Sequence, residues 1–196
     1  MDARQRRSRE RLHAAVLELA DATRADDLSV TAIAERAGIH RSTFYEHAGS
    51  PLALLRSALA VELDAARERY LEGVDPAALP AALRDVTRAV LEHVLRHADV
   101  YRRGLDSGGG LHDFLSEHFQ GSSRLLLDRG LLQPPPVAGL APEVVAEASI
   151  RYVADGTVGA IAVWLREPAH PEAFLEAVAH LVPGWWHMAD ADGGRG

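Results

Sequence analysis

The chain has 196 residues, of which 47% are hydrophobic and 25% are charged, and it contains no cysteine. This composition is typical of a globular protein with a sizeable core, and it excludes a disordered chain, a disulfide framework and thiolate chemistry. No apolar run approaches the roughly 20 residues that a membrane-spanning helix needs, and no apolar stretch follows the first charges as in a signal peptide. We therefore expect a cytoplasmic protein with no membrane partner.

The formal net charge of −7 argues at first against a nucleic-acid partner, but the charge is unevenly distributed. The first 50 residues hold eight arginines and eight acidic residues, so the remaining 146 carry the whole acidic excess. Five of those arginines fall within the first eleven residues. Because DNA binding needs a local basic surface rather than a basic protein, this distribution is compatible with a DNA partner.

Helical periodicity dominates the first third of the chain. Apolar residues three and four apart predict an amphipathic helix over about 5–23. A short second helix is expected over 30–37, ended by Gly38 in the left-handed conformation common after helices, and a third over 41–47. Ser50 and Pro51 suit the N-cap and first turn of a long helix that runs to about residue 72.

The rest of the chain is expected to form helices joined by glycine- and proline-rich loops. These helices span 76–97, 99–105, 111–129, 142–166 and 171–187, with a flexible glycine joint at 107–110 and a proline-rich loop within 133–142. We find no strand, so we predict an all-α fold. Its domains are a small helical domain over 1–50, a larger helical domain over 51–188, and a disordered tail over 189–196.

Residues 29–47 have the sequence form of a helix-turn-helix, two short helices joined by a tight turn with glycine. Ser29 is expected to cap the first helix, Ile33 and Ala34 to pack inward, and Phe44 to fill the small core. The second helix then presents outward a polar set that can bond to phosphates and base edges. This set is His40, Arg41, Ser42, Thr43, Tyr45 and His47. A helical hairpin in an unrelated bundle is the alternative.

The segment SVTAIAERAGIHRSTFYEH, residues 29–47, resembles the signature of the tetracycline-repressor (TetR) family of bacterial regulators, and the similarity extends over residues 8–60. The resemblance implies that this protein regulates transcription by binding double-stranded DNA. Arg41 and Ser42 would face base edges, and Thr31 would meet the backbone of the adjacent strand. Phosphates would be contacted by Thr43, Tyr45 and His47.

The same resemblance makes Arg4, Arg6 and Arg7 an N-terminal arm along the phosphates or in the minor groove. A solvated, frayed terminus is the alternative for these arginines. Pro51 stands where the family often has a lysine that meets a phosphate, so here the backbone N–H groups of the helix start would hold that phosphate.

The resemblance implies that the last two long helices of each subunit form a four-helix interface in a homodimer, which makes residues 51–188 the effector-binding and dimerisation domain. A reader of palindromic DNA also needs two-fold symmetry. Gly156 and Gly159 weaken a helix by roughly 1 kcal/mol each relative to alanine, which makes sense where another helix approaches closely. An intrachain core is the alternative for the apolar residues of these helices.

A small-molecule effector is expected to bind among the helices from 76 to 167. The candidate lining residues are His93, His97, Tyr101, Phe114, His118, Phe119, Tyr152, Asp155 and Trp164. His93 and His97 have the spacing of metal ligands on one helical face. No cysteine and no HExxH motif supports them, so we expect neither a metal nor a cofactor.

The leading interpretation is a ligand-responsive repressor that binds a palindromic operator as a dimer and is released by a small molecule. An enzyme is not expected, because the sequence has no Ser-His-Asp arrangement, no glycine-rich phosphate loop and no paired-carboxylate motif. A TetR-like coactivator or binding module without direct DNA contact is the alternative, favoured by the absence of the lysine at Pro51.

Overall fold

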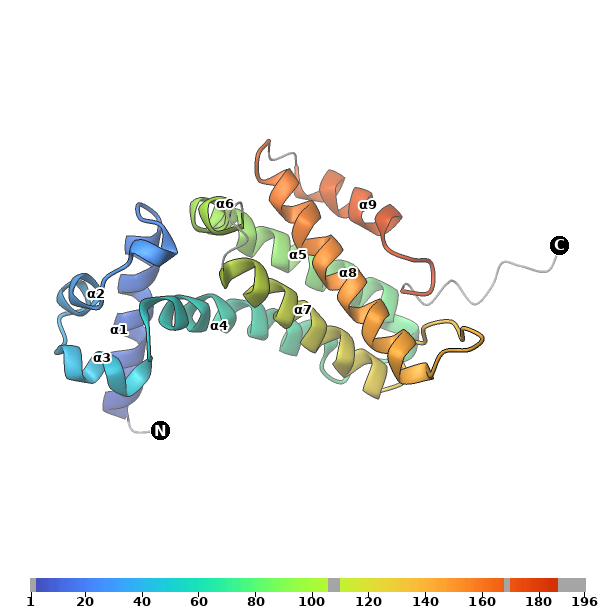
Figure 1. The fold of residues 1–196 in the computed structure, drawn as a ribbon, viewed down its shortest axis with the longest axis horizontal. Coiled ribbons are helices and arrows are strands. Elements are labelled where there is room, and N and C mark those ends of the chain that lie inside the picture. The colour runs from blue at the N-terminus through green and yellow to red at the C-terminus, as the bar shows by residue number, and fades with distance from the viewer. Residues whose placement is uncertain (1–2, 106–109, 168–169, 187–196) are drawn as a thin grey trace. The chain divides into compact units, whose positions relative to one another are not determined.

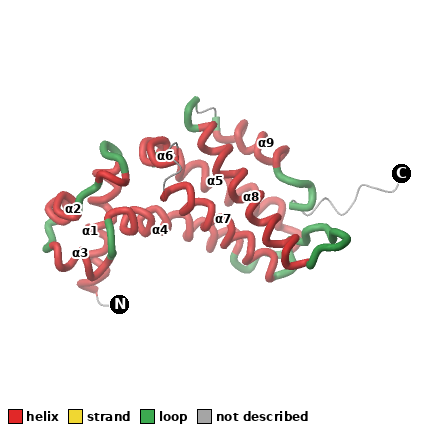
Figure 2. Tube along the Cα trace, in the orientation of Figure 1, coloured by secondary structure: helices red, strands yellow, loops and turns green. Residues whose placement is uncertain are grey.

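The computed structural model describes residues 3–105, 110–167 and 170–186, and every regular element in these ranges is a helix (Figures 1 and 2). The all-α prediction is therefore confirmed for this part of the chain. None of these helices is both long and apolar enough to cross a membrane. The predicted tail at 189–196 and most of the predicted joint at 107–110 lie outside the described residues.

The described chain divides into two compact units. The helix-turn-helix unit comprises the residues up to Asp64 together with His93–Phe114, and the bundle unit comprises Ala65–Glu92 together with the residues from Leu115 on. The α-helices are α1 (Ala3–Ala20), α2 (Val30–Ala37), α3 (Arg41–His47), α4 (Pro51–Leu71), α5 (Leu79–Arg96), α6 (Ala98–Leu105), α7 (Gly110–Asp128), α8 (Pro142–Trp164) and α9 (Pro171–Leu181). The domain boundary predicted after residue 50 falls at the start of α4, whereas the two units divide within α4, after Asp64. The predicted domain division stays a prediction.

The helix-turn-helix forms as its local sequence predicts. The Ser29 hydroxyl accepts a hydrogen bond from the Ala32 backbone N–H at 3.0 Å, which caps α2. Gly38 ends α2 with φ 62° and ψ 43°, a conformation that glycine adopts without steric cost. Ile33 and Phe44 are fully buried where α1 packs against α2 and α3. The two short helices are therefore stabilised by tertiary packing, since neither is long enough to be stable alone.

Helix α1 supports this turn through two arginine contacts. The Arg11 guanidinium donates a hydrogen bond from Nη2 to the Gly38 carbonyl oxygen at 2.9 Å. Glu18 forms an ion pair with Arg36 of α2 at 2.5 Å. These contacts fix the end of α2 relative to α1, and with it the start of α3.

Arg4, Arg6 and Arg7, the expected N-terminal arm, all belong to α1, because this helix begins at Ala3, slightly before its predicted start at about residue 5. Their contact with DNA stays a prediction. Arginine, glutamine and alanine are good helix formers, and neither glycine nor proline interrupts this segment. The Arg7 side chain donates from Nε to the Ala3 carbonyl oxygen, four residues earlier, at 3.3 Å. The three arginines are exposed on the first turns of the helix.

One predicted helix end is wrong. The last helix was expected to run to His187, but α9 ends at Leu181. Val182 has an extended conformation with φ −74° and ψ 146°. Pro183 explains this end, because a proline ring clashes with a helical conformation of the residue before it. The other predicted helix ends lie within about three residues of those observed. Different definitions of a helix end already differ by one or two residues.

The bundle unit is held together by side chains between α7 and α8, which run side by side in Figure 1. Ser116 Oγ donates a short hydrogen bond to the Asp155 carboxylate. Arg124 Nη2 donates to both carboxylate oxygens of Glu147 at 3.0 Å. A leucine core stabilises the same unit, made of Leu71, Leu79, Leu83, Leu126, Leu131 and Leu132.

Replacing Gly38 by alanine is expected to destabilise the protein by about 1–2 kcal/mol, the cost of a left-handed conformation for a residue with a Cβ. A Cβ at this position would also meet Arg11 Nη2 at 2.5 Å. Gly49→Ala is the matched control, because Gly49 has no positive φ and an added Cβ there meets nothing within 4 Å. Urea unfolding of both variants measures the difference. Equal stabilities would contradict a specific role of the Gly38 turn.

Candidate functional site

Helix α3 buries one large side chain and presents polar ones. Phe44 is fully buried, whereas the neighbouring Tyr45 is 55% exposed, with its ring edge-on to the Phe44 ring at a centroid distance of 5.5 Å. Of the other DNA contacts expected at α3 and its N-cap, His40, Arg41 and Ser42 are exposed, whereas Thr43 and His47 are half-buried. The side chains available on this helix can therefore donate to phosphates and base edges.

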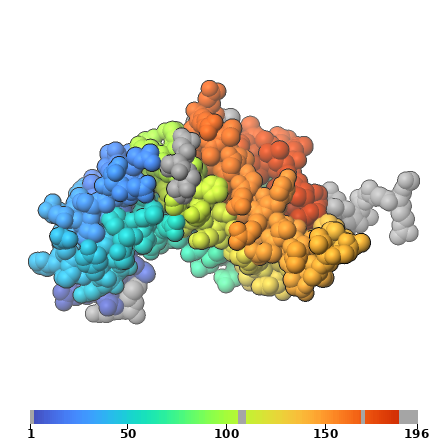
Figure 3. All heavy atoms as spheres, viewed as in Figure 1, coloured from blue at the N-terminus to red at the C-terminus, as the bar shows by residue number. Residues whose placement is uncertain are grey.

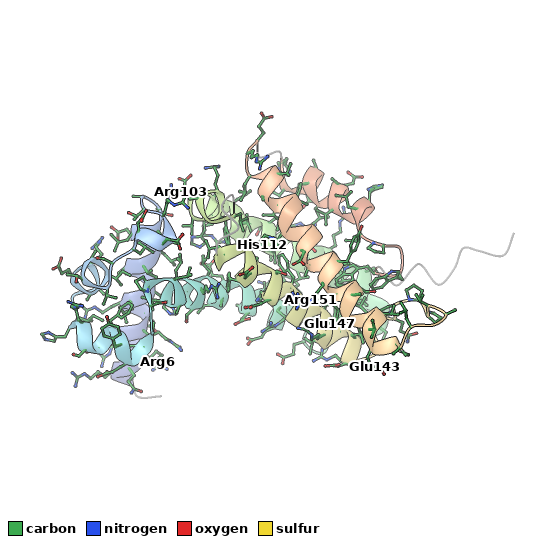
Figure 4. All side chains as sticks on the ribbon, in the orientation of Figure 1. Arg6, Arg103, His112, Glu143, Glu147 and Arg151 are labelled. Carbon is green, nitrogen blue, oxygen red and sulfur yellow. The ribbon has the colours of Figure 1, made fainter. Side chains whose placement is uncertain are left out.

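An open groove of about 700 Å³ lies between α3 and the first turns of α1. Its residues from α1 include Arg4, Arg7 and Arg11, and those around α3 include His40, Thr43, Glu46 and His47. Three guanidinium groups against one carboxylate make this concave surface attractive to phosphate. Arg6, labelled at the N-terminal end of α1 in Figure 4, and Thr31 of α2 are both exposed outside the groove lining. Their DNA contacts stay predictions.

The start of α4 is capped as expected. Ser50 Oγ accepts a hydrogen bond from the Ala53 backbone N–H at 3.1 Å, and Pro51 is the first helical residue. This cap already uses one of the orphan N–H groups that a phosphate could bind.

The bundle unit contains a cavity of about 110 Å³. Its apolar walls are formed by Leu71, Leu83, Val86, Val90, Leu91, Phe119, Leu126, Val153, Ala154, Ile161, Phe174, Val178 and Trp186. Apart from His118, the described residues that line it include no ionisable side chain. A cavity with such walls favours a ligand that is mainly apolar and carries no net charge.

The four hydroxyl groups that line this cavity can accept hydrogen bonds from a ligand but have no free proton to donate. Thr87, Ser123 and Thr157 each donate to the backbone carbonyl four residues earlier in their own helix at 2.7 Å. Ser122 does the same at 3.2 Å. Because each hydroxyl proton is already used, the oxygens are left as acceptors toward the cavity. A ligand with a hydroxyl or amide donor would match them.

Of the nine residues expected to line an effector site, His118 and Phe119 line this cavity. Trp164 is buried and stacks on the cavity residue Phe174, with ring centroids 4.7 Å apart. Tyr152 and Asp155 are exposed on α8, and Phe114 is buried in the helix-turn-helix unit. The other three, His93, His97 and Tyr101, belong to a separate polar network.

That network centres on Glu62, which the sequence analysis did not single out. His93 Nδ1 lies 3.0 Å from Glu62 Oε2, and His97 Nε2 lies 3.4 Å from Glu62 Oε1. The Tyr101 hydroxyl is 2.7 Å from His93 Nε2, and Arg96 donates to Glu62 Oε2. Glu62 is on α4, 31 residues before His93, so no local pattern marks it as their partner.

Burial and charge set the protonation of this network. Burial raises the pKa of Glu62, but hydrogen bonds from His93 and His97 and the charge of Arg96 outweigh burial and hold it below its usual value. Burial lowers the pKa of His93 and raises that of Tyr101. At neutral pH the hydrogen-bonding needs of Tyr101, His93 and Glu62 are met together in one arrangement. In it the Tyr101 hydroxyl donates to His93 Nε2, and His93 Nδ1–H donates to the Glu62 carboxylate.

Helix α8 carries an exposed stripe of apolar and small residues, which we name the α8 stripe. It consists of Val144, Ala148, Tyr152, Gly156, Gly159 and Val163. At about 100° per residue these positions fall within about 120° of one another around the helix. Tyr152 is 70% exposed and Val163 is 63% exposed, and a Cβ added at either glycine would meet nothing within 4 Å. In Figure 3, α8 (orange) lies at the surface of the bundle unit.

No family model and no curated protein sequence matches the chain, but solved structures do. A TetR-family transcriptional regulator from Streptomyces coelicolor aligns with a TM-score of 0.61 and 22% identity, over 92% of this chain and 80% of that one. The dihydroxyacetone kinase operon activator DhaS aligns with a TM-score of 0.58 and 12% identity, over 89% and 93% of the two chains.

A third match is FadR from Thermus thermophilus, a TetR-family transcriptional repressor solved in complex with lauroyl-CoA. It aligns with a TM-score of 0.55 and 21% identity, over 95% of this chain and 100% of that one. These alignments cover most of the chain, including parts of both units. Because the identities are low, the alignments establish the fold alone. The protein therefore has the fold of the TetR-family transcriptional regulators.

Proposed function

We propose that the protein is a ligand-responsive transcriptional repressor that binds a palindromic DNA operator as a homodimer. The observation that carries this proposal is the exposed polar surface of α3, held by the Gly38 turn beside the arginine-lined groove. In a helix-turn-helix the second helix enters the major groove and its N-terminal residues meet the base edges. Arg41 and Ser42 are the exposed side chains of that first turn.

A second copy of the chain is the partner proposed for the α8 stripe. Large exposed apolar side chains on one face of a helix mark an interaction surface, and glycines with open space above them allow another helix to approach closely. The exposed Leu181 extends the apolar surface to α9. A two-fold interface would place two recognition helices in successive major grooves, about 34–36 Å apart.

The cavity in the bundle unit is the proposed effector site. An apolar cavity of about 150 Å³ in a protein core holds a molecule the size of benzene, and the cavity here, at about 110 Å³, is of that order. The effector class is then a small neutral molecule, or the end of an apolar chain, with a hydrogen-bond donor. The solved FadR complex with lauroyl-CoA is an example of a protein of this fold with a bound acyl compound.

Release of DNA by the effector follows from linkage between the two sites. A ligand that favours one packing of the bundle helices weakens DNA binding by the same factor by which DNA weakens ligand binding. Helix α8 suits this coupling, because Val153, Ala154 and Ile161 line the cavity while the α8 stripe faces the other side of the helix.

Selection from a pool of randomised duplexes tests the DNA function, because it requires no operator sequence to be chosen in advance. The wild-type protein is expected to enrich an inverted repeat. Arg41→Ala is expected to weaken binding to that site by about 1–3 kcal/mol and to relax the preference at one base position, as loss of a base contact does. Tyr45→Ala is expected to weaken binding to all sequences.

Arg84→Ala is the matched control for this experiment, because Arg84 is an exposed arginine in the bundle unit. Its affinity should equal that of the wild type. A coactivator or binding module without direct DNA contact would enrich no sequence at low salt, and that outcome would overturn the proposal.

Hexan-1-ol, which combines an alkyl chain with a hydroxyl donor, is the probe for the effector site. We expect it to raise the thermal unfolding midpoint of the wild type and to weaken DNA binding in the same concentration range. Ala154→Leu fills the cavity and should abolish both effects, whereas Ala65→Leu on the exposed side of α4 should preserve them. A response retained by Ala154→Leu would place the effector elsewhere.

A further inference from the structure

We propose that Glu62, His93 and His97 form a binding site for a divalent transition metal of the zinc class, with a fourth position open to solvent or to a ligand. The three residues each offer one ligand atom, and these atoms lie within 4.8 Å of one another. Imidazole nitrogen and carboxylate oxygen are both zinc ligands, and sites with three protein ligands keep the fourth position for water or substrate. The inference does not depend on DNA binding.

The ligand atoms lie close enough to converge on a tetrahedral ion. With metal–ligand bonds of about 2.0–2.1 Å, neighbouring ligand atoms around tetrahedral zinc are about 3.3 Å apart. His93 Nδ1 lies 3.0 Å from Glu62 Oε2 and His97 Nε2 lies 3.4 Å from Glu62 Oε1. With one ligand atom from each residue the separations extend up to 4.8 Å, so the side chains would move closer together around an ion. His93 and His97 are four residues apart on α5 and the turn that follows it, so both rings lie on one helical face. Their ring centroids are 4.9 Å apart.

The surroundings of His93 are those of a metal ligand with a fixed ring. Metal-bound histidines usually hydrogen-bond through the other ring nitrogen, which orients the ring and sets its tautomer. The buried Tyr101 hydroxyl supplies that partner at His93 Nε2. On metal binding the ring proton would move from Nδ1 to Nε2, and the Tyr101 oxygen would accept it in a hydrogen bond while Nδ1 binds the ion. Tyr101 would then act as a positioning residue.

The three ligand side chains differ in burial, so that an ion bound between them would be shielded from water on the histidine side and accessible on the Glu62 side. His93 is 3% exposed and His97 is 11% exposed, whereas the Glu62 side chain is 35% exposed. An ion can therefore approach along Glu62 and lose most of its water against the two rings. All three ligands belong to the helix-turn-helix unit, so the bound ion would join α4 to the end of α5 within that unit.

Arg96 competes with the metal for Glu62. Its guanidinium donates to Glu62 Oε2, the oxygen nearest His93, and its side chain is 59% exposed. A flexible exposed arginine can swing away, but its positive charge opposes a divalent cation. Removing that charge should therefore tighten metal binding, an effect that a purely structural network of Tyr101, His93 and Glu62 does not produce.

The test is titration of untagged, chelator-treated full-length protein with zinc chloride, followed by calorimetry and thermal unfolding. We expect one zinc per chain and a higher unfolding midpoint, since binding to the folded state alone stabilises it. Glu62→Gln and His97→Gln should weaken zinc binding by about tenfold or more, and Arg96→Ala should strengthen it. His180→Gln, on an exposed histidine of α9, is the control and should bind as the wild type does.

Cobalt(II) provides a readout that does not depend on any variant folding correctly. Intense visible absorption on adding cobalt chloride to the wild type, lost on adding excess zinc, indicates a tetrahedral site of the expected kind. Weak octahedral absorption, or zinc affinity that is the same in the wild type, His97→Gln and Arg96→Ala, would overturn the proposal and leave the cluster as a hydrogen-bonded network.

Discussion

The left-handed turn at Gly38 is the constraint on which the candidate DNA surface depends. It joins two helices of eight and seven residues, each too short to form stably in isolation. Arg11 donates to the Gly38 carbonyl and fills the space in which a side chain would stand. With the turn held in this way, burial of Phe44 orients α3 and leaves Arg41 and Tyr45 exposed. A small number of local contacts therefore decides which side chains can meet DNA.

The sequence predicts the features that local rules control. The bounds of α3, the Ser29 cap and the Gly38 conformation follow from capping and turn chemistry. The end of α9 could also have been predicted, because Pro183 is visible in the sequence. The Glu62 network and the cavity could not, because each joins residues from helices far apart in the chain and depends on how those helices pack. Most of the residues that the sequence suggested for an effector site accordingly lie outside this cavity.

Helix α8 connects the two proposed activities of the bundle unit. One side contributes Val153, Ala154 and Ile161 to the cavity, and the α8 stripe occupies roughly the opposite side. Glu147 and Arg151, labelled on neighbouring turns in Figure 4, flank the stripe and form an ion pair at 3.4 Å. A packed helix moves as a rigid element rather than deforming continuously. A ligand that displaces its inner side would therefore shift its outer side, and with it the proposed contact between two copies.

The stoichiometry of the protein on DNA tests the central claim most directly. Sedimentation of the wild type with a duplex that carries the selected inverted repeat should show two chains per duplex. Tyr152→Glu, which places a charge in the α8 stripe, should leave one chain on a half-site with weaker binding. Val61→Glu, at another exposed apolar residue, should behave as the wild type does. A single wild-type chain on the full repeat, or no stable complex at all, would contradict a dimeric reader of DNA.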